Sequence, residues 1–108
     1  MVVSKPIVRA NWERSGNGWT IGTVSYKKKT YYFNIKNFIE GSVYGIDKGC
    51  ISKLFVSDSE HRVVMNYDRG WDVKPKDADA KAVLNAIKDR FNNGMDADDL
   101  ARYKKYVW

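Results

Sequence analysis

The hydrophobic pattern of this chain changes its period once, near residue 73, and that change constrains the fold more than any other feature. Before it, apolar and polar residues alternate in short runs, which is typical of half-buried β-strands. After it, apolar residues recur at the spacing of one helical face. These are Ala80, Val83, Leu84, Ile87 and Phe91. Because the strands come first and the helical pattern comes last, the chain is expected to be α+β.

The alternating part predicts an antiparallel, strongly curved sheet of about five strands. The five runs are residues 7–13, 19–26, 30–36, 50–57 and 61–68. Residues 37–49 are irregular but carry several apolar side chains. We therefore expect this segment to fold back over an open sheet edge or over the core, since a long structureless loop is uncommon in a compact domain.

Two C-terminal helices are predicted after the sheet. Asp77 is placed to cap the N-terminus of the first helix. The Asn92-Asn93-Gly94 stretch should end this helix, because Gly commonly follows a helix end. Asp96 should begin the second, with Leu100, Tyr103 and Val107 on its inner face. We expect a single domain over residues 1–108, with the sheet in 1–73 and the helical part in 77–108.

The chain is basic, with 19 Lys and Arg against 13 Asp and Glu, and a net charge of +6. Most of the excess positive charge lies in residues 1–70. A positive field of this kind attracts polyanions without specifying them, and it serves equally well against an acidic protein partner.

The sequence predicts a cytoplasmic protein with no membrane association. Cys50 is the one cysteine, so no internal disulfide can form. The first residues lack the basic start and long apolar run of a signal peptide, and no apolar stretch is long enough to span a bilayer.

No catalytic constellation stands out, and the chain is predicted not to be an enzyme. His61 is the single histidine and lies beside a turn, where exposure is expected. One His and one Cys cannot supply a zinc site, so no metal or other cofactor is predicted. Asp68 and Asp72 flank Arg69. One or the other is expected to pair with Arg69 and cap the turn, rather than the two acting as an acid–base pair.

Basic and aromatic residues interleave in residues 26–32. Tyr26, Lys27, Lys28, Lys29 and Tyr32 are predicted to bind nucleic acid, because rings stack on bases while ammonium groups contact phosphates. The alternative is that the neighbouring Tyr31 faces the core and the lysines only solubilise a turn.

A second candidate site joins a glycine-punctuated loop to an Arg-Gly-Trp corner. Tyr44, Lys53, Arg69 and Trp71 are predicted to contact a ligand or partner, because turns carried on a rigid scaffold often hold binding residues. The alternative is that Trp71 anchors the corner between sheet and helix, with Arg69 stacked or paired beside it and Lys53 solvated.

These two stretches also carry a resemblance. Ser42-x-Tyr44-Gly45-Ile46-x-x-Gly49-x-Ile51-Ser52-Lys53-Leu54, followed by Tyr67-Asp68-Arg69-Gly70-Trp71-Asp72, is similar to a family of small proteins encoded by phages and mobile elements of Gram-positive bacteria. The resemblance runs from about residue 19 to residue 73. It implies a phage or prophage origin and an accessory or counter-defence role in a bacterial host cell.

Three functional hypotheses follow. The first is a non-catalytic, anti-CRISPR-type inhibitor that binds a host defence protein, a nucleoprotein complex or its nucleic acid. The second is a sponge that holds a nucleotide immune signal between Tyr44, Arg69 and Trp71, with a homo-oligomer interface as one place for such a pocket. The third is a general single-stranded nucleic-acid-binding accessory protein that uses the residues of the 26–32 stretch.

Overall fold

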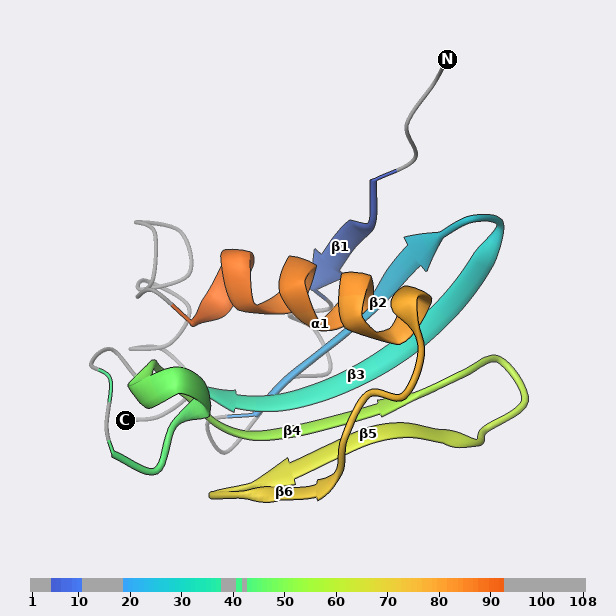
Figure 1. Cartoon of the computed structure of the whole chain (residues 1–108). Helices are drawn as coiled ribbons and strands as arrows, with labels where there is room; N and C mark the ends of the chain where they lie inside the picture. Colours follow the sequence, from blue (N-terminus) through green and yellow to red (C-terminus); the bar gives the residue numbers. More distant parts are fainter. Residues whose placement is uncertain (1–4, 11–18, 38–40, 42, 93–108) are drawn as a thin grey trace.

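The computed structural model describes residues 5–10, 19–37, 41 and 43–92. Six strands form one antiparallel sheet in which each strand pairs with the next along the chain (Figure 1). The strands are β1 (Ile7–Ala10), β2 (Trp19–Tyr26), β3 (Lys29–Asn37), β4 (Ile51–Ser57), β5 (Val63–Asp68) and β6 (Trp71–Val73). A 3₁₀-helix, η2 (Ile46–Lys48), precedes β4, and helix α1 (Ala78–Phe91) lies across one face of the sheet.

The predicted fold class is wrong in its details, although the α+β order of the chain is correct. The sheet has six strands rather than about five, it is not strongly curled, and one helix follows it among the described residues. Strand β6 escaped prediction because three residues are too few for an alternating pattern to appear. An open sheet needs only its ordinary twist to pack against one helix of 14 residues, so strong curvature is not required. The predicted second helix, from Asp96, lies outside the described residues.

Local signals place the strand and helix ends well. Strand β2 has the predicted bounds, and α1 begins directly after Asp77, whose carboxylate accepts a hydrogen bond of 2.7 Å from the Ala80 N–H. Lys27 and Lys28 form the two-residue turn between β2 and β3, with φ of 50° and 62°. Positive φ at both central residues is the turn geometry that matches the twist of a hairpin.

The core lies between α1 and the face of the sheet beneath it. Tyr31, Phe33 and Ile35 of β3 are all buried, and Phe33 meets Phe91 of α1 with ring centroids 5.8 Å apart. The helical residues predicted to share one apolar face are all buried in the same core. Further core side chains come from the other strands. These are Val24, Leu54, Val56, Met65 and Tyr67.

The segment before β4 is tied to the end of α1, as expected for a segment folded over the core. Ile46 is buried, and the Asn92 side chain donates to the Ile46 carbonyl and accepts from the Ile51 N–H, each at 2.8 Å. Val43 and Tyr44 remain exposed. The buried amide thus fixes a loop that presents two large side chains to solvent.

Candidate binding surface on the open face of the sheet

The face of the sheet opposite α1 is the main candidate for a binding surface, and we call it the open face. Strand alternation defines it: with Phe33 and Ile35 under the helix, Tyr32, Asn34 and Lys36 project to the other side. Strand pairing extends this face over β2 to β5. Its residues are Trp19, Ile21, Thr23, Tyr32, Asn34, Lys36, Lys53, Phe55, Ser57, Asn66 and Asp68. Within the described part of the chain, no helix lies on the open face.

Two aromatic rings stand exposed in the middle of the open face. Tyr32 is 44% exposed and Phe55 is 36% exposed. Tyr32 pairs with Ser57, and Phe55 pairs with Asn34, so the two rings occupy diagonal positions on neighbouring strands. Such diagonal neighbours are about 7–8 Å apart. The sheet therefore holds two rings in solvent at a fixed and short separation.

A row of one aromatic and three charged residues crosses one end of the open face. Trp19 pairs with Lys36, Lys36 with Lys53, and Lys53 with Asp68, on four successive strands. The Lys53 Nζ lies 6.0 Å from the centroid of the Trp19 ring and 3.9 Å from the Asp68 Oδ1. Arg69 reaches the same oxygen, with its Nε at 3.5 Å. Exposed ion pairs of this kind are weak, so an anionic ligand can compete for both cations.

The predicted 26–32 stretch does not form one platform. Tyr26 is half-buried and packs against the core on the helix side, whereas Tyr32 lies on the open face. Asp79 of α1 accepts a 3.0 Å hydrogen bond from the Lys27 Nζ and lies 3.6 Å from the Lys29 Nζ. The hydrogen bond from Lys27 lowers the pKa of Asp79 and raises the pKa of Lys27.

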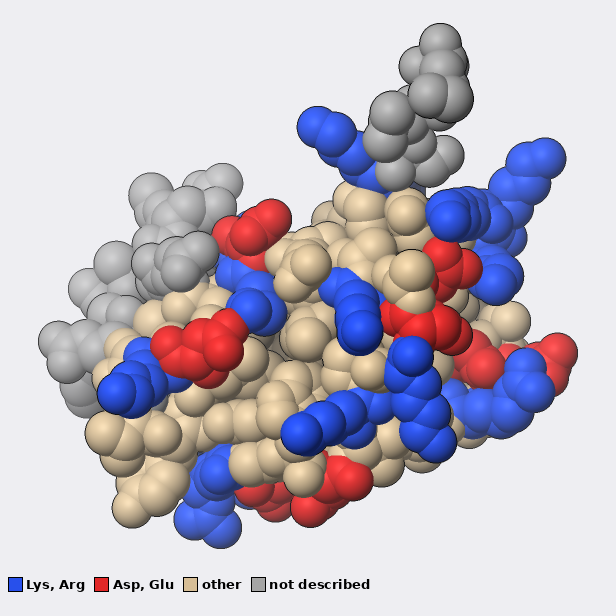
Figure 2. Space-filling model, in the orientation of Figure 1, with Lys and Arg blue, Asp and Glu red and all other residues tan. Residues whose placement is uncertain are grey.

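Lys28 is exposed at the tip of this hairpin. On the face that Figure 2 shows, which is the one that carries α1, acidic side chains lie beside basic ones in several separate places. Carboxylates therefore offset much of the positive charge on that side of the molecule.

The second predicted set lies at one end of the sheet but is divided between its two faces. The Trp71 ring packs edge-on against Tyr67, with centroids 5.1 Å apart, and the Tyr67 hydroxyl donates to the Tyr44 carbonyl at 2.9 Å. Arg69 occupies the β5–β6 turn with φ of 57°. Lys53 instead belongs to the open face. Trp71 thus anchors the corner, as in the structural alternative, while Tyr44 is 61% exposed.

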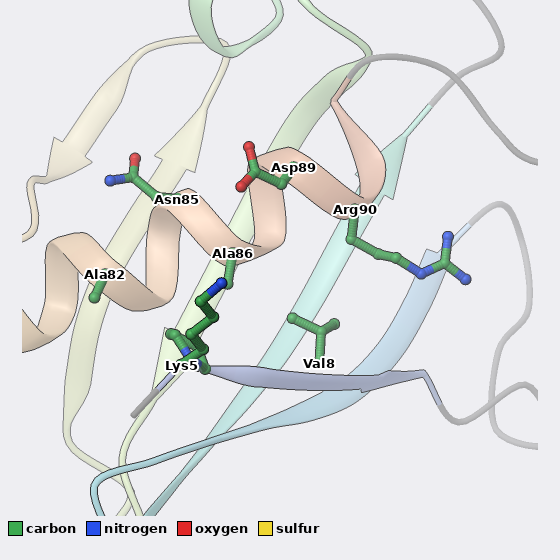
Figure 3. A pocket seen from close by; sticks show the side chains of 8 residues that line it. Lys5, Val8, Ala82, Asn85, Ala86, Asp89 and Arg90 are labelled. Carbon is green, nitrogen blue, oxygen red and sulfur yellow. The ribbon is translucent and has the colours of Figure 1, made fainter. Parts of the chain in front are cut away.

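Two of the clefts lined by described residues lie away from the open face. The larger, of about 700 Å³, runs between β1 and α1 (Figure 3), where Val8 points toward the helix and Lys5 reaches toward Ala86. Asp89 and Arg90 add opposite charges to its wall, beside the ammonium group of Lys5.

The smaller cleft, of about 320 Å³, is polar and includes Asp58, Glu60, Arg62 and Tyr31. Backbone hydrogen bonds, first from Arg62 and then from Glu60, lower the pKa of Asp58, and burial raises the pKa of Tyr31. The Asp58 carboxylate thus stabilises the turn between β4 and β5. Among the described residues, no group of three or more His, Cys, Asp or Glu could hold a metal ion.

The single histidine and the single cysteine of the chain differ in burial. His61 is exposed in the β4–β5 turn, as predicted, and Cys50 is buried. No helix in the described ranges combines the length and the apolar character that crossing a bilayer requires.

Comparison with known proteins places the chain in a family. Residues 18–92 match a domain of unknown function, DUF7678. The chain belongs to this family. The matched segment runs from β2 through α1, so the DUF7678 domain contains every residue of the open face, while β1 lies before it. Searches of curated proteins and of solved structures found no match to the chain.

The open face of this DUF7678 domain contains residues that the sequence interpretation passed over, above all Trp19, Asn34, Phe55 and Asn66. A signal for Phe55 was present. Phe55 alternates with Lys53 and Ser57 on the outward-facing positions of β4, and the other residues of this strand are buried. A large ring in the solvent-facing phase of a strand points to a surface role, because the core does not account for it.

Proposed function

We propose that this protein is a non-catalytic binding protein that holds single-stranded nucleic acid on the open face of its sheet. The observation that carries the proposal is the pair of exposed rings, Tyr32 and Phe55, on neighbouring strands. Every base has a flat apolar face, so rings displayed on a sheet bind unpaired bases with little regard to sequence. Two bases of one strand can stack on two rings held at this spacing.

The charges around these rings support the same ligand. Lys36 and Lys53 lie one row away from Phe55, and Arg9, on β1, pairs with Thr23 beside Tyr32. These cations can contact the phosphates on either side of the stacked bases. Asp68 is the acidic member of the open face, and it already lies against Lys53 and Arg69. The overall charge of +6 adds a long-range attraction for the strand.

The biological setting is part of the proposal. The resemblance at residues 42–54 and 67–72 favours a protein of phage or mobile-element origin that acts in the cytoplasm of a bacterial host. A module that grips unpaired strands could occupy the guide or the displaced strand of a host nucleoprotein complex, and so act as an anti-CRISPR-type inhibitor. The nucleotide sponge has less support, since Trp71 already packs on Tyr67 and the Arg69 guanidinium lies beside Asp68.

The proposal is tested by fluorescence anisotropy with a labelled single strand of about 20 nucleotides, which is longer than a typical single-strand site. Tyr32→Ala and Phe55→Ala should each weaken binding about fivefold or more, because stacking contributes about 1–3 kcal/mol per base. Tyr44→Ala is the matched control, since it removes an exposed ring that lies outside the open face.

The pattern of losses decides the outcome. Loss of affinity in both open-face variants, with the Tyr44 variant unchanged, supports the proposal. Absence of binding by the unaltered protein at low salt would overturn it, as would equal losses in all three variants. If Tyr44→Ala alone abolished binding of a small nucleotide, the sponge hypothesis would replace it.

A further inference from the structure

Phe55 has two identical neighbours on the open face. It pairs directly with Asn34 on β3 and with Asn66 on β5. Because neighbouring strands lie about 4.8 Å apart, the two asparagines flank Phe55 on opposite sides, with their backbones roughly 10 Å from each other. A base stacked on this ring therefore meets a carboxamide at each of two edges.

Neither carboxamide is bonded to another part of the described structure. Within the described residues, no hydrogen bond or ion pair involves the side chain of Asn34 or Asn66, and Asn34 is exposed. Each amide offers one acceptor oxygen and two donor hydrogens. Elsewhere the chain uses an Asn side chain differently: Asn92 is buried and has both of its polar ends bonded to the backbone.

The partners of Tyr32 are of another kind. They are Thr23 on β2 and Ser57 on β4, whose short hydroxyls can donate to or accept from any base. The two ring positions thus differ in what surrounds them. The Tyr32 position is suited to unselective stacking, and the Phe55 position is suited to recognition of one base.

We infer that Asn34 and Asn66 recognise the base that stacks on Phe55, and that this base is adenine. The inference rests on the proposed function. Asparagine binds adenine through a paired donor and acceptor, the N6 amino group and N7. The adenine amino group carries a second hydrogen beside N1, so two amides on opposite sides can each bind one donor–acceptor pair of the same base. Thymine has no amino group, and cytosine has a ring acceptor on only one side of its own. Guanine presents two acceptors, N7 and O6, at the edge where adenine presents an acceptor and a donor.

The experiment compares labelled homopolymers of deoxyadenosine, deoxythymidine and deoxycytidine of equal length in direct binding and in competition. The unaltered protein should bind the adenine polymer about tenfold more tightly than the thymine polymer, within the range for a good bidentate contact. Asn34→Leu and Asn66→Leu keep the size of the side chain and remove its hydrogen bonds. Together they should reduce the preference to about twofold or less and leave thymine binding unchanged.

The matched control is Thr23→Val with Ser57→Ala, which alters the partners of Tyr32 and should keep the preference for adenine. Asn34→Leu alone provides a second test at an exposed position, where folding is least disturbed. If all three polymers bind equally, the inference is wrong while the proposed function stands. A preference that survives in the double asparagine variant also overturns it, because stacking alone would then select the base. If no polymer binds, the proposed function itself fails.

Discussion

The two faces of the sheet contain the same kinds of residue in very different states. Phe33 and Phe55 lie on neighbouring strands, yet Phe33 is fully buried and Phe55 is 36% exposed. Tyr31 and Tyr32 are adjacent in sequence, and the first is buried while the second is exposed. Helix α1 makes the difference, because it covers one face and leaves the other uncovered by any helix of the described chain (Figure 1).

The lysines of the two faces also differ in how closely carboxylates approach them. On the helix side, Asp79 lies between Lys27 and Lys29 and offsets both. On the open face, Lys36 has no ion pair to any described residue, and Lys53 meets Asp68 only at 3.9 Å. The lesson is that a run of lysines in the sequence is a weaker guide to an anion-binding surface than scattered lysines whose ion pairs to the described residues are long or absent.

The largest effect is expected from removing the two phenylalanines in turn. Phe33→Ala should lower the free energy of unfolding by about 3–5 kcal/mol, because it leaves a cavity under α1. Phe55→Ala should change it by about 1 kcal/mol or less, since an exposed ring contributes little to the core. Urea denaturation of both variants measures the contrast. Similar losses of stability in the two would show that the open face is part of the folding core.

The next effect concerns the lysines of the two faces. For a single strand, Lys36→Gln and Lys53→Gln should each reduce the slope of log affinity against log salt concentration by about 0.7. Each change should therefore lower the affinity roughly fivefold at about 0.1 M salt. Lys27→Gln and Lys29→Gln should leave both quantities nearly unchanged, because these lysines face Asp79. Titrations at several salt concentrations test this. A larger loss of affinity in the Lys27 and Lys29 variants would show that the binding surface lies at the β2–β3 hairpin instead.

The smallest effect is a pH dependence on the helix side. The Lys27 hydrogen bond lowers the pKa of Asp79 in the folded protein. A carboxylate with a lowered folded pKa stabilises the protein above its unfolded pKa of about 3.9, and this stabilisation is lost as pH falls through the folded value. The melting temperature of the unaltered protein should therefore exceed that of Asp79→Asn near neutral pH, and the two should converge in acid.

Asp72→Asn is the control for this measurement, because Asp72 is exposed on β6 and makes no ion pair to a described residue. Its melting curve should follow that of the unaltered protein across the whole range of pH. A difference between the Asp79 variant and the unaltered protein that persists in acid would show that Asp79 acts through something other than its charge.

Much of the fold follows from short-range patterns. The bounds of β2, the cap at Asp77 and the buried face of α1 were all predictable, because each depends on residues within a few positions of one another. Strand β6 was not predictable, since its three residues become a strand only by pairing with Tyr67 and Asn66 of β5. The predicted sets of site residues mixed the two faces for a related reason: sequence proximity placed Tyr26 and Tyr32 together, whereas the sheet separates them.

By itself, the sequence determined the order of the elements, the alternation within each strand and the excess of positive charge. All of these are properties of the local backbone or of composition. Only the tertiary structure decided which alternate residues stay exposed, that Asp79 faces a lysine 52 positions away, and that Asn34 and Asn66 flank Phe55. These depend on contacts between distant parts of the chain. Such contacts form where the packing of α1 outweighs the entropy lost in ordering the whole domain.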